Sequence, residues 1–179
     1  MFGLSFTTRE FWAVIHGMIL GGLFLISFAG GLAGLYLLRP KWMTSEGLRE
    51  EAHQLVSGTW IMAIVAWLTV TTGTYIVYPW YRAKPPEGAD LTQYPRSFLK
   101  ANEAIAAWHN FGMEWKEHVA WFAPILATIV AYIVWRYKDE LAENDRLRKY
   151  TIIFFMLAFL AAAVAGLMGA LITKAAPVA

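Results

Sequence analysis

The chain has 179 residues, of which 58% are hydrophobic and only 16% charged, and its formal net charge is +2. The mean hydropathy of +0.45 is too high for an ordinary soluble domain. No block of Lys and Arg alternates with aromatic residues, so nucleic-acid binding has no support. With no cysteine, the chain cannot form a disulfide, a thiolate metal site, a cysteine-held iron–sulfur cluster or a covalent haem attachment.

Four long apolar runs predict an all-α membrane protein with a bundle of four transmembrane helices. Each run approaches or exceeds the roughly 17–25 residues that a helix needs to cross about 30 Å of hydrocarbon. The predicted helices cover 11–38, 55–78, 117–136 and 150–173, within a single membrane domain of 1–179. The first run is too long for a signal-peptide core and has no Ala-x-Ala cleavage site, so we expect it to be retained as an anchor.

The first predicted helix carries His16 in the apolar stretch FWAVIHGMILGG. An ionisable side chain within a membrane span is costly unless it faces the protein interior and finds a partner. Helical spacing places His16 on one face with Leu20, Leu23 and Ser27. One interpretation is a packing histidine that is hydrogen-bonded to a neighbouring helix. The other is an axial ligand of a b-type haem, with Gly17 making room for the macrocycle.

His53 precedes the second predicted helix, at the membrane surface opposite to that of His16. It is therefore a poor partner for His16, although it is a candidate for a proton or quinone contact. Segment 79–116, between the second and third helices, holds four prolines and a glycine within YPWYRAKPPEGADLTQYPRSF. We predict a long extramembrane loop there, which is ordered or bound to a partner because its aromatic residues suit a free linker poorly.

The stretch WHNFGMEWKEHVAWFAP leads into the third predicted helix. His109 and His118 are nine residues apart, which places them on opposite faces of a straight α-helix. We expect His118 to be the partner of His16 in haem ligation, with Glu114 orienting its imidazole. His109 would then face the surface or a partner subunit, but a break at Gly112 would weaken the preference for His118.

The charged residues of this stretch have two interpretations. Glu114, Glu117 and His118 suit proton exchange or a hydrogen bond to a quinone headgroup. They also suit an ordinary helix start at the membrane surface, where acidic residues complement the helix dipole and Lys116 reaches out to water. The fourth helix has no ionisable residue in its apolar core, and its small residues predict close packing.

Orientation follows from the even number of crossings and from the basic residues. The short connections 39–51 and 136–149 are rich in Lys and Arg, so we expect them to be cytoplasmic. Both termini and the 79–116 loop are then periplasmic, in a bacterial inner membrane.

The placement of His16 and His118 on two of four spans resembles the four-helix membrane b-type cytochromes that serve respiratory oxidoreductases. This resemblance implies an electron-transfer subunit of a respiratory or photosynthetic-type complex rather than a stand-alone enzyme. It would bind one haem b and connect the quinone pool to a partner such as an extramembrane cytochrome or iron–sulfur protein. The family's diheme pattern needs two histidine pairs, and this chain supplies at most one. The alternative is a cofactor-free subunit that anchors larger partners.

Overall fold

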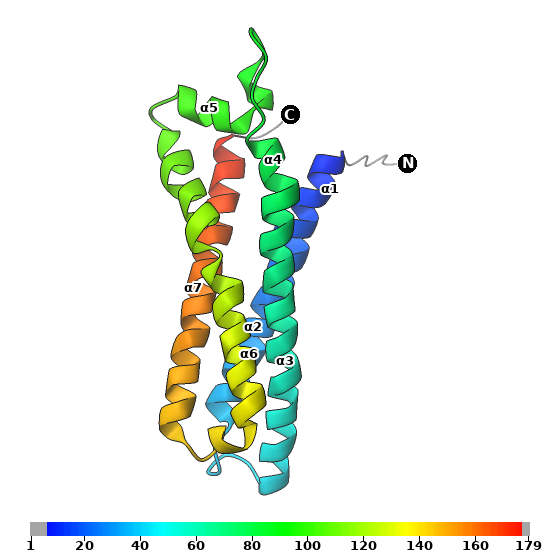
Figure 1. Ribbon diagram of the computed structural model, residues 1–179, viewed down its shortest axis with the longest axis vertical. Coiled ribbons are helices and arrows are strands. Elements are labelled where there is room, and N and C mark those ends of the chain that lie inside the picture. The colour runs from blue at the N-terminus through cyan, green and yellow to red at the C-terminus, as the bar shows by residue number, and fades with distance from the viewer. Residues whose placement is uncertain (1–6, 177–179) are drawn as a thin grey trace. The chain divides into compact units, whose positions relative to one another are not determined.

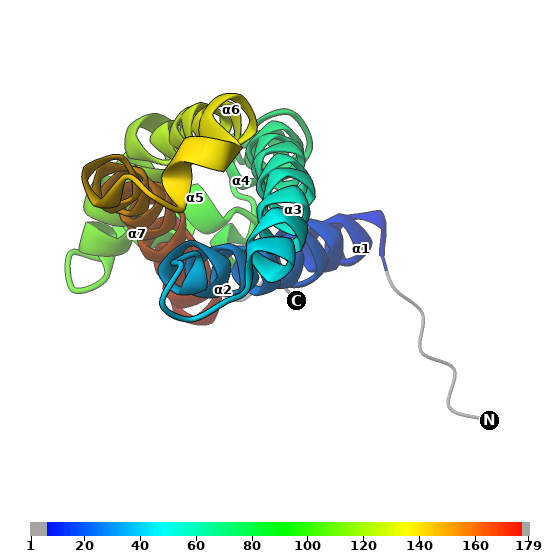
Figure 2. The ribbon, with the colours of Figure 1, turned by 90° about the horizontal axis from the view of Figure 1, so that it is seen from below.

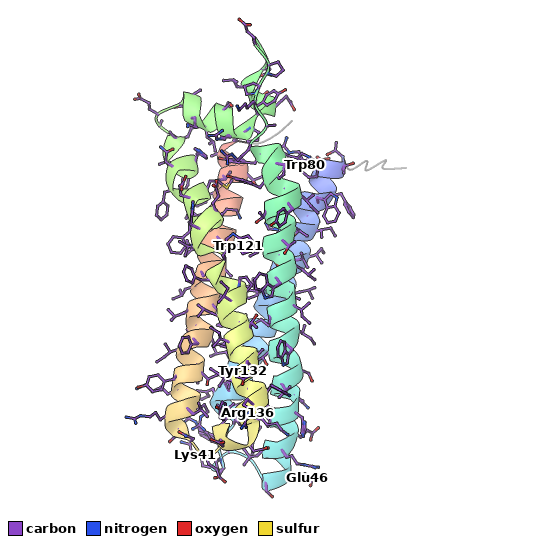
Figure 3. All side chains as sticks on the ribbon, viewed as in Figure 1. Lys41, Glu46, Trp80, Trp121, Tyr132 and Arg136 are labelled. Carbon is purple, nitrogen blue, oxygen red and sulfur yellow. The ribbon has the colours of Figure 1, made fainter. Side chains whose placement is uncertain are left out.

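The computed structural model describes residues 7–176, in which all regular structure is helical (Figure 1). Four helical segments are long and apolar enough to cross a membrane: Thr8–Leu37, Ser45–Tyr81, Trp108–Leu141 and Asp145–Ala175. They confirm the all-helical class and the four predicted spans, and they indicate an integral membrane protein. Each is longer than predicted, because hydropathy marks only the apolar part of a helix. Many large exposed side chains are apolar, Tyr132 among them (Figure 3), as lipid contact favours.

Three of the four spans change helix type along their length. The first is α1 (Thr8–Val14), the π-helix η1 (Ile15–Leu20) and α2 (Gly21–Leu37). The second is α3 (Ser45–Thr72), the π-helix η2 (Gly73–Val77) and α4 (Tyr78–Tyr81). The third is made of two π-helices, η4 (Trp108–Met113) and η5 (Trp115–Val119), followed by α6 (Phe122–Leu141). The fourth is the single helix α7 (Asp145–Ala175).

The predicted loop 79–116 is largely helical. The second span continues to Tyr81, and the third begins at Trp108. Between them lie the 3-10 helix η3 (Leu91–Gln93), capped by Asp90, and the helix α5 (Pro95–Ala101), which starts on a proline. A proline is compatible with the first turn of a helix, where its missing N–H is not needed. The irregular part is therefore much shorter than the sequence suggests.

The described chain divides into two compact units. Of the described residues, unit 1 consists of 7–21, Leu68–Trp121 and 163–176, and unit 2 of Gly22–Trp67 and Phe122–Ala162. In unit 1, a cluster of buried apolar side chains holds α5 against the ends of the spans. Its buried members are Tyr81, Leu99, Met113, Ile172 and Ala176.

Unit 2 is packed through aromatic side chains and small residues. The Phe28 ring stacks on those of Phe155 and Phe159, with centroids 4.9 and 4.2 Å apart. Gly31 lies against Phe155, where an added Cβ would come within 2.8 Å of the ring. The absence of a side chain at Gly31 thus lets the two helices approach closely, as small residues do in membrane helix packing.

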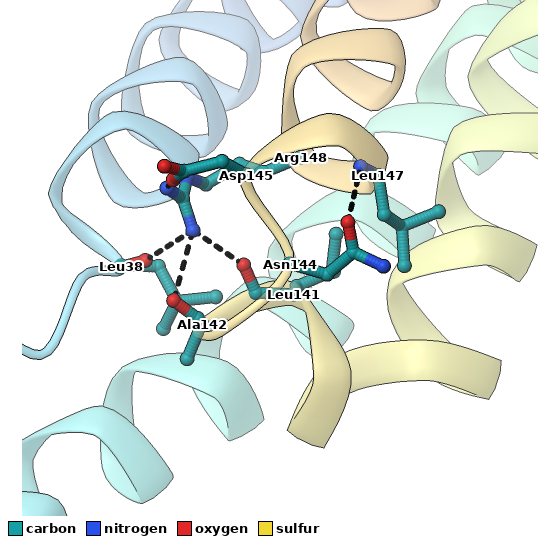
Figure 4. A network of polar contacts seen from close by, with 7 residues as sticks. All are labelled: Leu38, Leu141, Ala142, Asn144, Asp145, Leu147 and Arg148. Atoms are coloured by element: carbon teal, nitrogen blue, oxygen red, sulfur yellow. Dashed lines mark hydrogen bonds and ion pairs between the residues drawn. The ribbon is translucent and has the colours of Figure 1, made fainter.

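One arginine ties together the connections at one end of unit 2, the end seen in Figure 2. Arg148 donates from Nη1 to the carbonyl oxygens of Leu38, Leu141 and Ala142, at 3.1, 2.6 and 3.0 Å (Figure 4). Its Nη2 contacts the Asp145 carboxylate. The last carbonyls of a helix have no partner within the helix, and a cation favours the negative end of the dipole. Arg148 therefore caps both α2 and α6.

All four π-helices of the described chain lie in unit 1. Such helices account for well under 1% of residues in proteins and are frequent at functional sites. Two of them have a simple cause, because η2 and η5 are closely followed by Pro79 and Pro124. A proline inside a helix cannot donate its hydrogen bond and clashes with the preceding turn, which a wider turn accommodates. No proline closely follows η1 or η4, which contain His16 and His109.

Candidate functional site in unit 1

His16 faces the second span. Its Nδ1 lies 3.3 Å from the Thr72 hydroxyl oxygen, and its ring is also hydrogen-bonded to the Thr69 backbone. The ring covers Gly73, where an added Cβ would lie 2.6 Å from Cε1. His16 is thus hydrogen-bonded to a neighbouring helix, as one of the two interpretations of its sequence position required.

His109 is buried, with 8% of its surface exposed. Its Nδ1 shares a hydrogen bond of 2.8 Å with the Tyr81 hydroxyl. Arg96, on α5, acts electrostatically on both Tyr81 and His109. The Nε–H of Arg96 is buried and has no hydrogen-bond partner within residues 7–176. A buried donor without an acceptor is rare in native proteins and costs stability.

Two further polar residues extend this arrangement. The Tyr78 hydroxyl accepts a hydrogen bond of 3.0 Å from Arg82 Nη1 and is hydrogen-bonded to Glu117. Glu117 also acts electrostatically on Tyr81 and His109. We call Tyr78, Tyr81, Arg96, His109 and Glu117 the His109 cluster. It combines proton donors and acceptors from two spans and α5.

The helical phase of the third span differs from the prediction. The His118 side chain is 69% exposed, whereas His109, expected to face the surface or a partner, is buried. The two histidines do lie in different environments, as residues on opposite faces should, but the inward one is His109 rather than His118.

Glu114 lies beside His118, as expected, with a carboxylate oxygen 3.4 Å from Nδ1, and both side chains are exposed. The Glu114 carbonyl oxygen is also 3.0 Å from that nitrogen. His53 belongs to unit 2, where Lys138 Nζ lies 3.5 Å from its Nε2. Glu114 acts electrostatically on His109, whereas His53 does not contribute to the His109 cluster.

Lys116 does not reach out to water as predicted. Its Nζ donates to the carbonyl oxygen of Ala165 on α7 at 3.1 Å. It also lies against Gly169, where an added Cβ would be 3.0 Å from Nζ. Lys116 exerts an electrostatic effect on His16. The third span thus carries a lysine turned into the protein, which its hydropathy did not indicate.

The environments of the described histidines bear on the predicted haem. One iron needs both nitrogens at the same depth on opposite sides of the macrocycle. His118 is exposed. His16 and His109 are held by Thr72 and Tyr81, whose separation of nine residues corresponds to a helical rise of roughly 13 Å. Likewise, no group of three His, Asp or Glu residues within 7–176 could hold a metal ion. Haem ligation by His16 and His118 stays a prediction.

Sequence reasoning identified His16 but missed Thr72, Gly73, Tyr81 and Arg96. A threonine, a glycine and a tyrosine near the end of an apolar span are ordinary there, so nothing in their own pattern marks them. The proline at position 79 was the available signal, since it indicates an irregular helix just before it.

Comparison with known protein families, curated proteins and solved structures finds no match for this chain.

Proposed function

We propose that the protein is an integral membrane subunit of an oxidoreductase complex that exchanges electrons with the quinone pool. In this proposal the His109 cluster binds the quinone headgroup. The main support is the buried hydrogen bond of 2.8 Å between Tyr81 and His109, a donor–acceptor pair on which Arg96 and Glu117 act electrostatically. A quinone carbonyl oxygen accepts hydrogen bonds from groups such as a tyrosine hydroxyl or an imidazole N–H.

The cluster also supplies what quinone chemistry needs from a protein. Reduction of one quinone consumes two electrons and two protons and yields one quinol. The electrons would come from a redox centre in a partner subunit, such as an extramembrane cytochrome or iron–sulfur protein. The protons would pass through His109 and Tyr81, with Glu117 and Tyr78 as the next groups. A histidine is suited to this role because it gains and loses a proton near neutral pH.

The test uses the protein purified together with its native partners. Quinone reduction or quinol oxidation should fall by about 100-fold in His109→Ala, a typical loss for a removed acid–base group. Tyr81→Phe should show a smaller loss. His53→Ala is the matched control, since its imidazole is exposed and belongs to unit 2, and it should retain the activity. Equal activity in all three variants would contradict the proposed site.

The same preparation tests the predicted haem b. A reduced-minus-oxidised spectrum should show a b-type α band if haem is bound, and His16→Ala should remove it. Loss of that band in His118→Ala would instead support the pair predicted from the sequence. Absence of the band in the complex with its native partners would refute the haem prediction without affecting quinone binding.

A cofactor-free anchoring subunit is the second candidate. It is favoured by the close packing of the His16 ring against Gly73, because this packing accounts for the histidine without any bound cofactor. In that case His16→Ala would weaken the assembly of the complex, and quinone turnover per assembled complex would be unchanged.

A further inference from the structure

A second site, unrelated to the proposed redox function, lies in unit 2 between the end of α2 and the start of α7. We propose that it binds the phosphate headgroup of an anionic phospholipid. The site is a hollow of about 390 Å³, a size typical of ligand sites. It is lined by Tyr36, Arg39, Asp145, Arg148, Lys149, Ile152 and Ile153.

Arg39 is the central residue of this lipid site. Its guanidinium lies over the Tyr36 ring, with Cζ 4.9 Å from the centroid, which fixes the direction of the side chain. The Arg39 Nε–H is buried and lacks a hydrogen-bond partner in the described part of the chain. The guanidinium is thus held in one direction at the wall of the hollow, where it can pair with an anion.

The other charges of the lipid site favour an anion. Lys149 is exposed at its edge. Arg148 is committed to backbone carbonyls and contacts Asp145, so the one acidic residue of the hollow already faces a cation. An adjoining hollow shares Arg39, Asp145 and Arg148 and adds Lys41 and Glu143. Basic pockets between membrane helices near the surface are a known setting for anionic lipid headgroups.

Apolar residues identify the source of the phosphate as a lipid rather than a free ion. Ile152 and Ile153 follow Lys149 on α7, and Tyr36 precedes Arg39 at the end of α2. Tyr36 and Ile153 are exposed, on helices apolar enough to cross a membrane. An acyl chain can therefore lie along these side chains while its headgroup meets Arg39 and Lys149. A free phosphate would gain nothing from this apolar wall.

The test is native mass spectrometry of the full chain in detergent, titrated with dioleoyl phosphatidylglycerol or dioleoyl phosphatidylcholine. Arg39→Gln/Lys149→Gln should weaken phosphatidylglycerol binding by about 25-fold, since each basic contact near a lipid surface contributes about fivefold. Arg136→Gln/Arg146→Gln removes the same charge outside the hollow and should change binding less than about twofold. If the double variant does not fold, Arg39→Gln alone should show about a fivefold loss.

Three outcomes would overturn the proposal. The first is equal binding of the two lipids by the wild-type chain. The second is an equal loss in both double variants, which would indicate general surface charge. The third is complete displacement of phosphatidylglycerol by millimolar inorganic phosphate, which would identify a free-phosphate site.

Discussion

Replacement of Arg148 by leucine should destabilise the protein strongly through unit 2. The substitution removes the donor that caps α2 and α6 at the carbonyls of Leu38, Leu141 and Ala142. Leu38 and Leu141 are fully buried, so water cannot readily replace the guanidinium there. The exposed Asp145 carboxylate, in contrast, can be hydrated when it loses its partner.

The magnitude follows from the two buried carbonyls. Each loses its hydrogen bond at a cost of about 1–3 kcal/mol when no other donor is available. Burial of the leucine side chain offsets about 1 kcal/mol of this. We therefore expect the free energy of unfolding to fall by about 3 kcal/mol. The unfolding free energy of Arg148→Lys should lie between those of the wild type and Arg148→Leu, because a single ammonium cannot reproduce the guanidinium fork.

The assay is reversible unfolding in mixed micelles of increasing sodium dodecyl sulfate content, followed by circular dichroism. Arg146→Leu is the matched control, since Arg146 is exposed two residues away and should change stability by less than about 0.5 kcal/mol. Equal unfolding curves for Arg148→Leu and Arg146→Leu would refute the capping role.

Three further outcomes are expected from single changes. Gly73→Ala should lower the unfolding free energy by about 1–3 kcal/mol, because its Cβ would clash with the imidazole 2.6 Å away. Gly58→Ala, with nothing within 4 Å, should be neutral or stabilising in the same assay. Lys116→Met should change stability by less than about 1 kcal/mol, since an apolar side chain of similar shape needs no buried partner; a larger loss in that assay would contradict this. Hydrogen bonds from Thr92 hold the pKa of Asp90 below its ordinary value. The ionised Asp90 carboxylate therefore stabilises this turn fully above the ordinary carboxyl pKa, and this stabilisation is lost as the pH falls through the lowered pKa. The protection of the Thr92 amide against hydrogen exchange should then decrease in acid. Unchanged protection in Asp90→Ala would contradict the cap.

The four spans could be predicted because about twenty consecutive apolar residues leave few alternatives to a membrane helix. Their ends could not. The stretch 45–54 is helical and rich in charge, and hydropathy, which marks only the apolar part of a helix, placed it outside the predicted span. The helix α5 was missed because prolines and a glycine dominate its surroundings, while its own burial depends on Leu99 contacting the distant residues of the unit 1 cluster.

The candidate site was predictable only in part. His16 stood out because an imidazole is conspicuous among apolar residues, whereas its partner Thr72 and its neighbour Gly73 are common in membrane helices. The helical wheel separated His109 from His118 but did not show which of them is turned inward, and the choice of His118 was wrong. Contacts between segments far apart in the chain decide this, and a single sequence does not reveal them.

The π-helices also have a consequence for the history of this sequence. A π-turn is equivalent to an α-helix into which one residue has been inserted. Deletion of one residue from Ile15–Leu20 would shorten the first span by only about 1.5 Å but would rotate the segment before it by about 100°. A membrane helix of this kind can therefore gain or lose a residue and still cross the bilayer, while its histidine turns to another neighbour.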